Sequence, residues 1–391
     1  MQQEISYKNY FERLTKILKD PRDKRGKRHN LAFICCCVII AIMNGRLYPT
    51  AIQRYIKNRH ADLCEQLGHE SKREISLSQL LRVLRLIDWE VWNRVNLAHF
   101  NQTIDVETSS EKEEQWWTCD GKELRGSIET GKKRGLNVVR AIGQTDKVVL
   151  VQRYYDGSKE SEKVEVRQIV SQEAKGKKVT FDALHCEPEV LGIVEENDGK
   201  YIVQTKANQQ LMVAELVAAS RYLPKQAIYK THDKGHGRVE SRTYKSYDLR
   251  HPLFDDCLHE RWENCGIRTL ITCHRKFTTL KTEEIEEQTS LYISNDSHFG
   301  NDKNGIKTKE WGAAIRNHWQ IESDHFVRDV TFKEDFLKIK GHQIQKIMSI
   351  CISAAVMLYR KINVTNFQAA TELFSDSPKP FFDKLRSINF L

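Results

Sequence analysis

The sequence predicts an α/β protein in which a mixed β-sheet follows a helical N-terminal region. Apolar residues recur at helical spacing through residues 1–100. Between residues 115 and 205, five β-branched or aromatic runs are interspersed with two helical stretches, which is typical of a mixed sheet with helices packed on it. Strand-like runs return between residues 209 and 308 and indicate a β-rich insertion.

Composition excludes several classes of protein. The chain has 391 residues, of which 40% are hydrophobic and 29% are charged, so it can bury a large core and is not globally disordered. The longest apolar run, Leu31 to Met43, is too short to span a bilayer and predicts a buried helix. Its consecutive cysteines, Cys35 to Cys37, favour buried free thiols in a reducing compartment. No signal peptide is evident, and we expect a soluble cytoplasmic protein.

The positive charge is concentrated at the N-terminus. The chain carries a net charge of +9, and residues 1–60 alone hold thirteen Lys and Arg against four Asp and Glu. The densest group comprises Arg22, Lys24, Arg25, Lys27 and Arg28. Clustered positive charge favours a polyanionic partner such as nucleic acid, although a solvated surface would give the same pattern. Residues 206–250 form a second basic zone.

These patterns divide the chain into four parts. A helical, basic domain over residues 1–100 includes Ser78 to Asp88, which has leucines on one face and arginines on the other. Residues 101–114 are polar and acidic and are interpreted as a linker. The α/β domain covers residues 115–345, with its insertion at about 209–308 and a helix expected at Lys309 to Asp329. A C-terminal helix and a weakly patterned tail occupy residues 346–391.

Three acidic residues are candidates for catalysis. Asp120 follows one predicted strand, Asp182 follows another, and Glu322 lies in the helix expected after the insertion. A buried carboxylate without a partner is costly, but a divalent cation at the same place would remove that cost. Three converging carboxylates could hold two Mg²⁺ ions, which clamp the attacking and leaving oxygens of a phosphoryl transfer. Taken singly, each acid could equally cap a strand end or a turn.

Several sequence blocks, in this order, carry a resemblance to a known family. They are Asp120-Gly121-Lys122-Glu123-Leu124-Arg125-Gly126-Ser127, Phe181-Asp182-Ala183-Leu184-His185, Gln204-Thr205-Lys206-Ala207-Asn208-Gln209, His236-Gly237-Arg238-Val239-Glu240-Ser241-Arg242, His318-Trp319-Gln320-Ile321-Glu322 and Asp329-Val330-Thr331-Phe332-Lys333-Glu334-Asp335. Over roughly residues 10–360 the chain resembles the H-repeat-associated, ISAs-type family of bacterial insertion-sequence transposases. Asp20-Pro21-Arg22 and Arg82-Val83-Leu84-Arg85 resemble that family's associated N-terminal domain.

The resemblance implies a fold, an activity and partners. The fold would be an RNase H-like DDE core, with Asp120, Asp182 and Glu322 as catalytic and metal-binding carboxylates. The protein would bind the terminal repeats of its element, cut the DNA there in a reaction that depends on two Mg²⁺ ions, or Mn²⁺, and join the exposed 3′-hydroxyl to target DNA. We expect a homodimer in the synaptic complex with double-stranded DNA, no membrane association, and a bacterial cytoplasmic location.

The third motif departs from that of hairpin-forming relatives. Their helix carries a Tyr-x2-Arg-x3-Glu-x6-Lys pattern, whose other positions are Ile315, His318 and Asp329 in this chain. Helical spacing instead places His318, Glu322, His325 and Asp329 on one stripe, which could hold metal, order phosphates or merely form internal hydrogen bonds. Candidate DNA contacts are Lys122, Arg125, Lys206, Arg238, Arg242, Arg316, His318, His325, Arg328, Arg22, Lys24, Arg25, Lys27 and Arg28.

Three alternatives stay open at this point. A domesticated, non-catalytic DNA-binding protein would bind DNA without cutting it. A structure-specific nuclease on the same fold would cut DNA but would not join a pre-cut end to target DNA. A zinc hydrolase could use His318 and His325, although the sequence lacks an HExxH arrangement.

Overall fold

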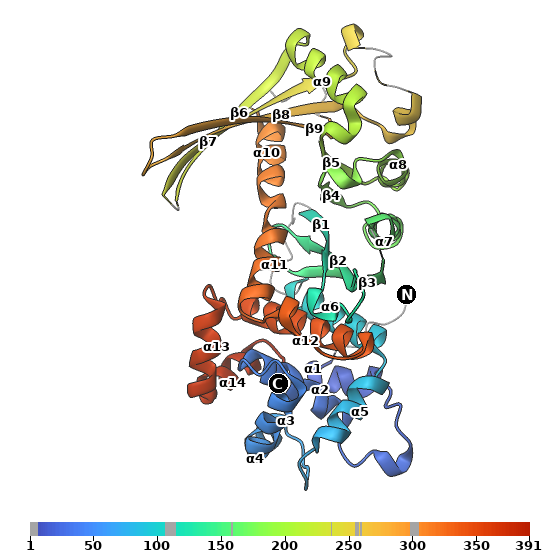
Figure 1. The fold of residues 1–391 in the computed structure, drawn as a ribbon, viewed down its shortest axis with the longest axis vertical. Coiled ribbons are helices and arrows are strands. Elements are labelled where there is room, and N and C mark those ends of the chain that lie inside the picture. Colours follow the sequence, from blue (N-terminus) through green and yellow to red (C-terminus); the bar gives the residue numbers. More distant parts are fainter. Residues whose placement is uncertain are drawn as a thin grey trace.

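The computed structural model describes residues 7–105, 115–157, 159–235, 237–254, 258, 260–297 and 305–391. The molecule is elongated, as Figure 1 shows. The N-terminal and C-terminal helices gather at one end, a β-sheet occupies the middle, and a twisted ribbon of long strands projects from the other end. In the part of the chain that is described, no helix combines the length and the apolar character needed to cross a membrane.

The N-terminal region is helical, with one central helix that is buried on all sides. The helix α2 (Leu31–Met43) has the predicted bounds, and every one of its residues is buried. Asn30 caps it by accepting a hydrogen bond from the backbone N–H of Phe33 at 2.9 Å. The surrounding helices are α1 (Tyr10–Ile17), α3 (Pro49–Asn58), α4 (His60–Gln66), α5 (Leu77–Leu86) and α6 (Trp89–Asp105).

The helix α6 differs from the sequence prediction at its C-terminal end. Residues 101–105, which we expected in the linker, extend the helix to Asp105. Buried apolar residues on α6, including Trp92, Val95 and Phe100, hold it against the rest of the core up to that point. The remainder of the expected linker, residues 106–114, lies outside the described residues.

All described strands join one nine-stranded sheet in the order β3-β2-β1-β4-β5-β9-β8-β7-β6. The strands β1, β4 and β5 run parallel to one another, and all other neighbouring pairs are antiparallel. The bounds are β1 (Trp116–Glu123), β2 (Leu136–Gly143), β3 (Val149–Asp156), β4 (Lys178–Phe181), β5 (Lys200–Thr205), β6 (Lys225–Gly235), β7 (Arg238–Asp248), β8 (Thr269–Thr279) and β9 (Ile285–Ser294).

Helices cover both faces of this sheet. Tyr201 and Val203 of β5 pack in one core with α7 (Lys159–Gln172), α8 (Pro188–Glu196) and α9 (Gln210–Tyr222). Ile202, which points to the other face, packs with Trp311 of α10 (Ile306–His318). This alternation is the period-two pattern of a strand buried on both sides.

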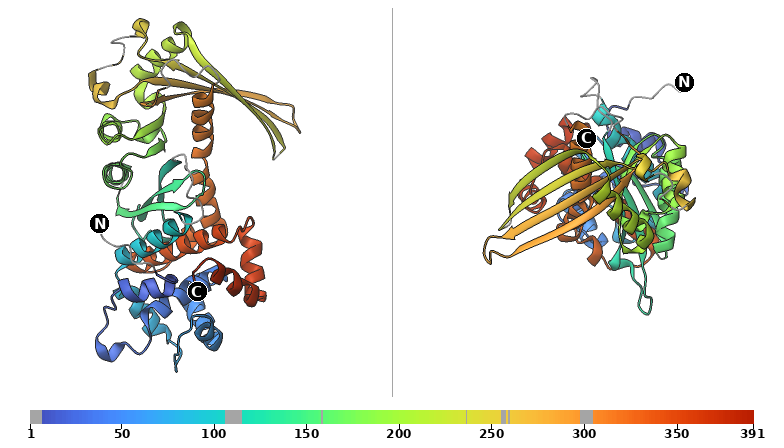
Figure 2. Two further views of the ribbon diagram at one scale, coloured as in Figure 1. Left: turned by 180° about the vertical axis from the view of Figure 1, so that it is seen from behind. Right: turned by 90° about the horizontal axis from the view of Figure 1, so that it is seen from above.

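The insertion extends the core sheet. Residues Ile202 to Thr205 of β5 pair with Leu291 to Ser294 of β9, and β8, β7 and β6 follow outward. Figure 2 shows the long strands curving away from the body of the molecule. The edge strand β6 was not predicted, because most of its residues are polar and exposed and none is fully buried, so its apolar alternation is weak.

The C-terminal helices complete the structure. The single helix expected at Lys309 to Asp329 is two helices, α10 and α11 (Gln320–Val330), separated at Trp319. The long helix α12 (His342–Lys361) lies between the N-terminal helices and the sheet and shares one hydrophobic core with α2 (Figure 1). The tail, which showed little pattern, forms α13 (Phe367–Asp376) and α14 (Pro378–Ser387).

Candidate active site

Two of the three predicted acids lie at the same level on neighbouring strands. The strands β1 and β4 pair in parallel with Thr118 opposite Thr180, so Asp120 and Asp182, two residues further along, are also neighbours. The carboxylate of Asp182 accepts a hydrogen bond from the backbone N–H of Leu184 at 3.0 Å, which fixes it where β4 ends. The parallel register thus brings together acids that are 62 residues apart.

At this edge of the sheet, negatively charged carboxylates lie close to one another and repel. Burial, and then the negative charges of Asp182 and Glu162, raise the pKa of Asp120 to about 7. Carboxylates that repel one another hold a proton or a cation between them. Carboxylate oxygens are also the ligands that Mg²⁺ prefers.

The helical stripe predicted around Glu322 packs over the same edge. His318, at the end of α10, shares a hydrogen bond of 2.9 Å between its Nδ1 and the hydroxyl of Thr180. Further along, Nδ1 of His325 lies 3.8 Å from Oδ2 of Asp120. At the far end, Nζ of Lys122 donates to Oδ1 of Asp329 at 2.6 Å. Successive residues of the stripe therefore lie against successive positions of the strands. They meet Thr180 on β4 first, and then Asp120 and Lys122 on β1.

Both histidines of the stripe are neutral at physiological pH. Burial lowers the pKa of His318 to about 4, and the nearby Asp182 charge opposes that shift. Burial, followed by the charge of Arg140, lowers the pKa of His325 to about 3. The Nε2 atom of His325 is buried and has no hydrogen-bond partner among the described residues. Neutral imidazoles are suited to hydrogen bonding or metal ligation rather than to pairing with phosphate.

Glu322 lies on this stripe between the two histidines, but its side chain is exposed. Burial raises its pKa, and the Lys206 ammonium, which follows β5, partly offsets that rise. Glu322 therefore faces Lys206 at the open side of the site, whereas Asp120 and Asp182 lie at its floor.

A metal ion would find a partial set of ligands here. Asp120 and Asp182 suit a divalent cation, because both offer carboxylate oxygens and their mutual repulsion is what a cation relieves. Within the ranges that the structure describes, however, no group of three or more His, Cys, Asp or Glu is close enough to hold one ion. The two aspartates fit the predicted role, and Glu322 would have to move inward to join them.

Sequence reasoning missed a fourth carboxylate. Glu162 lies near the start of α7, and its Oε2 accepts a hydrogen bond from the hydroxyl of Tyr155 at 3.1 Å. Its Oε1 is 3.3 Å from Nε2 of His185, which is fully buried. The signal that could have revealed it is Gly121, because a Cβ there would lie 2.3 Å from the Glu162 carboxyl carbon. The glycine after Asp120 leaves room for this carboxylate.

Comparisons with known proteins give the family context. Residues 11–100 match a family model described as DDE_Tnp_1-associated. The H repeat-associated putative transposase YhhI of Escherichia coli K12 is 24% identical over 340 residues, which are 85% of each chain. The putative transposase YncI of Escherichia coli O157:H7 is 28% identical over 355 residues, 88% of this chain and 85% of its own.

The predicted family resemblance is confirmed. Two of the proteins to which this chain is similar, YhhI and YbfD of Escherichia coli K12, are named H repeat-associated putative transposases. Among solved structures, a piggyBac transposase synaptic complex with hairpin DNA aligns with a TM-score of 0.40 and 10% identity, covering 91% of this chain and 73% of that one.

Several of the cations predicted to contact DNA are exposed. Arg125, Arg316 and Lys206 are exposed, and so is Arg238, which lies at the start of β7 in the ribbon. In the N-terminal region, the exposed cations are Lys24, Arg25, Lys27 and Arg28. These side chains are available to a partner.

Four other cations predicted to contact DNA are instead paired with carboxylates of the protein itself. Arg328 is fully buried against Asp324, with Nε 2.5 Å from Oδ2. Arg22 is buried and pairs with Asp20. The remaining two are Arg242, which pairs with Asp233 and Glu240, and Lys122, which pairs with Asp329 and Asp335. His318 and His325 are likewise directed inward, toward Thr180 and Asp120.

The departure of the third motif has a structural counterpart. Ile315 is buried in the core that contains Trp311. Asp329, where the hairpin-forming relatives have a lysine, instead receives the ammonium of Lys122 from β1. The positive charge at this end of the stripe thus comes from the strand rather than from the helix.

Proposed function

We propose that the protein is a DNA transposase with an RNase H-like core, which binds the ends of an insertion sequence and catalyses metal-dependent strand cleavage and strand transfer. The observation that carries the proposal is the proximity of Asp120 to Asp182, two residues beyond the last paired position of adjacent parallel strands and close to the helix that bears Glu322. The order β3-β2-β1-β4-β5, with its antiparallel first half and parallel second half, supports the core assignment.

The residues of the chain have distinct roles in this proposal. Asp120 and Asp182 would hold Mg²⁺, and Glu322 would complete the ligand set from α11. The bound ions would stabilise the attacking and leaving oxygens of a phosphoryl transfer. His318 and His325, neutral and packed on the strands, position the helix over the two aspartates. The exposed cations Lys206, Arg125 and Arg316 would orient the phosphates of the scissile strand.

The proposed chemistry has two steps that share one site. In hydrolysis, the oxygen of water attacks phosphorus, the bond from phosphorus to the 3′ oxygen breaks, and the freed 3′ oxygen takes up a proton. In strand transfer, that 3′-hydroxyl attacks a phosphodiester of target DNA, loses its proton, and displaces the target strand's own 3′ oxygen. Both steps are displacements at phosphorus, so one set of carboxylates can serve both.

Cleavage of terminal-repeat DNA by purified protein in Mg²⁺ or Mn²⁺ tests the proposal. We expect Asp120→Ala, Asp182→Ala and Glu322→Ala each to abolish cutting while DNA binding is retained. Ser323→Ala, an exposed neighbour on the same helix, is the matched control and should cut normally. Full activity in any of the three acid variants would defeat the assignment, as would undiminished cutting after chelation of divalent metal.

The exposed position of Glu322 favours one second candidate, a DNA-binding protein that no longer cuts. This candidate predicts that the wild-type chain binds terminal-repeat DNA but yields no cleaved strand in either metal. Joining of a pre-cut end to target DNA would exclude both this candidate and a simple nuclease.

A further inference from the structure

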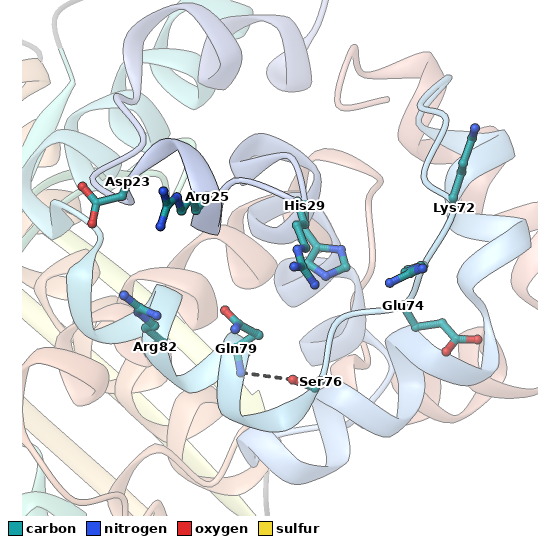
Figure 3. A pocket seen from close by; sticks show the side chains of 10 residues that line it. Asp23, Arg25, His29, Lys72, Glu74, Ser76, Gln79 and Arg82 are labelled. Carbon is teal, nitrogen blue, oxygen red and sulfur yellow. Dashed lines mark hydrogen bonds between the residues drawn. The ribbon is translucent and has the colours of Figure 1, made fainter.

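A basic cavity of about 770 Å³ opens in the N-terminal helical region. Figure 3 shows its lining, which comes from two segments of the chain. One wall carries Arg25 and His29, which precede α2. The other carries Lys72, which precedes α5, and Arg82, which lies in α5. Its cationic lining residues are Arg25, Arg28, Lys72, Arg73 and Arg82, against two carboxylates, Asp23 and Glu74.

A second cavity of about 660 Å³ adjoins the first. The two share Arg28, His29 and Lys72. The second adds three lysines, Lys16, Lys19 and Lys27, and two carboxylates, Asp20 and Glu70. We call the two adjoining cavities together the basic trough. It unites the Lys- and Arg-rich segment around residues 19–28 with residues 72–82, which are distant in the sequence.

The cations of the trough are available to a ligand. Arg25, Arg28, Lys72, Arg73 and Arg82 are all exposed. In the described part of the chain, none of these five lies within ion-pair distance of a carboxylate. Cations that converge without internal partners repel one another, and a bound polyanion removes that repulsion.

A buried arginine holds one wall of the trough in place. Arg22 donates to Oδ1 of Asp20 at 2.8 Å and to the backbone carbonyl of His29 at 2.6 Å. These bonds close the loop that presents Arg25 and Arg28. On the other wall, Ser76 caps α5 by accepting from the backbone N–H of Gln79, so the positive end of that helix also faces the cavity. The trough is thus preorganised before a ligand arrives.

We infer that the basic trough binds the phosphate backbone of double-stranded DNA. The inference rests on the proposed function, because it names the surface through which the N-terminal region would hold an element end. Two adjoining cavities with cations on both walls exceed what a single phosphate ion needs, whereas a duplex presents one negative charge about every 1.7 Å along its axis. Each contact releases a counterion, so binding weakens as salt rises.

Fluorescence anisotropy with a short labelled duplex of arbitrary sequence tests the inference. The test variant combines Arg25→Glu with Arg82→Glu, one change on each wall. The control combines Arg54→Glu with Lys57→Glu, which makes the same change of charge on exposed residues of α3 that line neither cavity. Loss of two phosphate contacts should weaken binding about 60-fold at ~0.1 M salt and reduce the salt slope by about 1.8. The control should lose less than about threefold.

The possible outcomes separate the trough from the active site. Equal weakening by both double variants, or no weakening by the test variant, overturns the trough. Displacement of the duplex by millimolar inorganic phosphate at constant ionic strength also overturns it, because the site would then bind single anions. Failure of the wild-type protein to cut DNA, with the predicted binding difference intact, refutes the proposed catalysis and leaves the trough supported. Circular dichroism establishes that all the variants are folded.

Discussion

Replacement of Asp324 by asparagine should destabilise the protein strongly. Asp324 lies on α11 and is almost fully buried. Its two carboxylate oxygens accept from Nε of Arg328 at 2.5 Å and from Nη2 of Arg360 at 2.7 Å. Burial alone would raise the pKa of Asp324, but the two guanidinium groups outweigh it and hold that pKa far below its ordinary value.

The expected magnitude follows from what the substitution leaves behind. Arg328 has no exposed surface, so in Asp324→Asn it would keep a buried charge without its counter-ion. Removing one partner of a buried ion pair typically costs about 3–5 kcal/mol. Arg328 also donates to the hydroxyl of Ser353 on α12 at 2.8 Å, so the same change loosens the contact between α11 and α12.

Urea unfolding followed by tryptophan fluorescence measures this free energy. The matched control is Asp383→Asn, because Asp383 is exposed and its pairing with Arg386 spans one helical turn at the surface. Such pairs contribute about 0.2–1 kcal/mol. A loss of less than about 1 kcal/mol in Asp324→Asn would refute the argument. A double variant, Asp324→Leu with Arg328→Met, should recover much of the loss, because neither charge remains buried.

Three further predictions concern other parts of the molecule. Glu162→Gln should lower the pKa of Asp120 toward its ordinary value, because one of the charges that raises it is removed; a carboxyl NMR titration of the metal-free protein that shows no change would contradict this. Burial lowers the pKa of His99 to about 3, so the unfolded chain alone takes up its proton between about pH 6.5 and 3, and stability should fall by up to about 5 kcal/mol as pH decreases through that range. Urea midpoints of His99→Gln should be flatter with pH, and parallel curves would rule out this origin. Gly126→Ala places a Cβ 2.6 Å from the carbonyl oxygen of Leu337 and should cost about 1–3 kcal/mol in thermal unfolding, whereas Gly235→Ala, with open space around it, should change stability by less than about 0.5 kcal/mol.

The fold could be predicted where one segment carries its own pattern. The uninterrupted apolar run of α2 and the β-branched runs of the core strands correspond to the observed elements, because burial on all sides or on both faces leaves a local signature. The pairing of β5 with β9 has no such signature, since the partners are about ninety residues apart and their register depends on the whole insertion.

Some residues of the candidate site could likewise be predicted from the sequence, and others could not. Asp120 and Asp182 could be predicted because each follows a recognisable apolar run, although β1 continues past Asp120 to Glu123. Glu162 could not, because its approach depends on how α7 packs on the sheet. Arg328 looked like a surface cation, although Asp324 precedes it by four residues, the spacing of a helical ion pair. Arg22 also looked like a surface cation, since the sequence does not reveal that its loop folds back over it.

The continuity of the sheet gives the ribbon a mechanical role. The outer strands are hydrogen-bonded through β9 to β5, and β5 ends at the residue before Lys206. A torque applied to the far end of the ribbon is therefore transmitted along the ladder toward the candidate site. A load on the ribbon would be felt at the position of Lys206, so the insertion can act as a rigid lever.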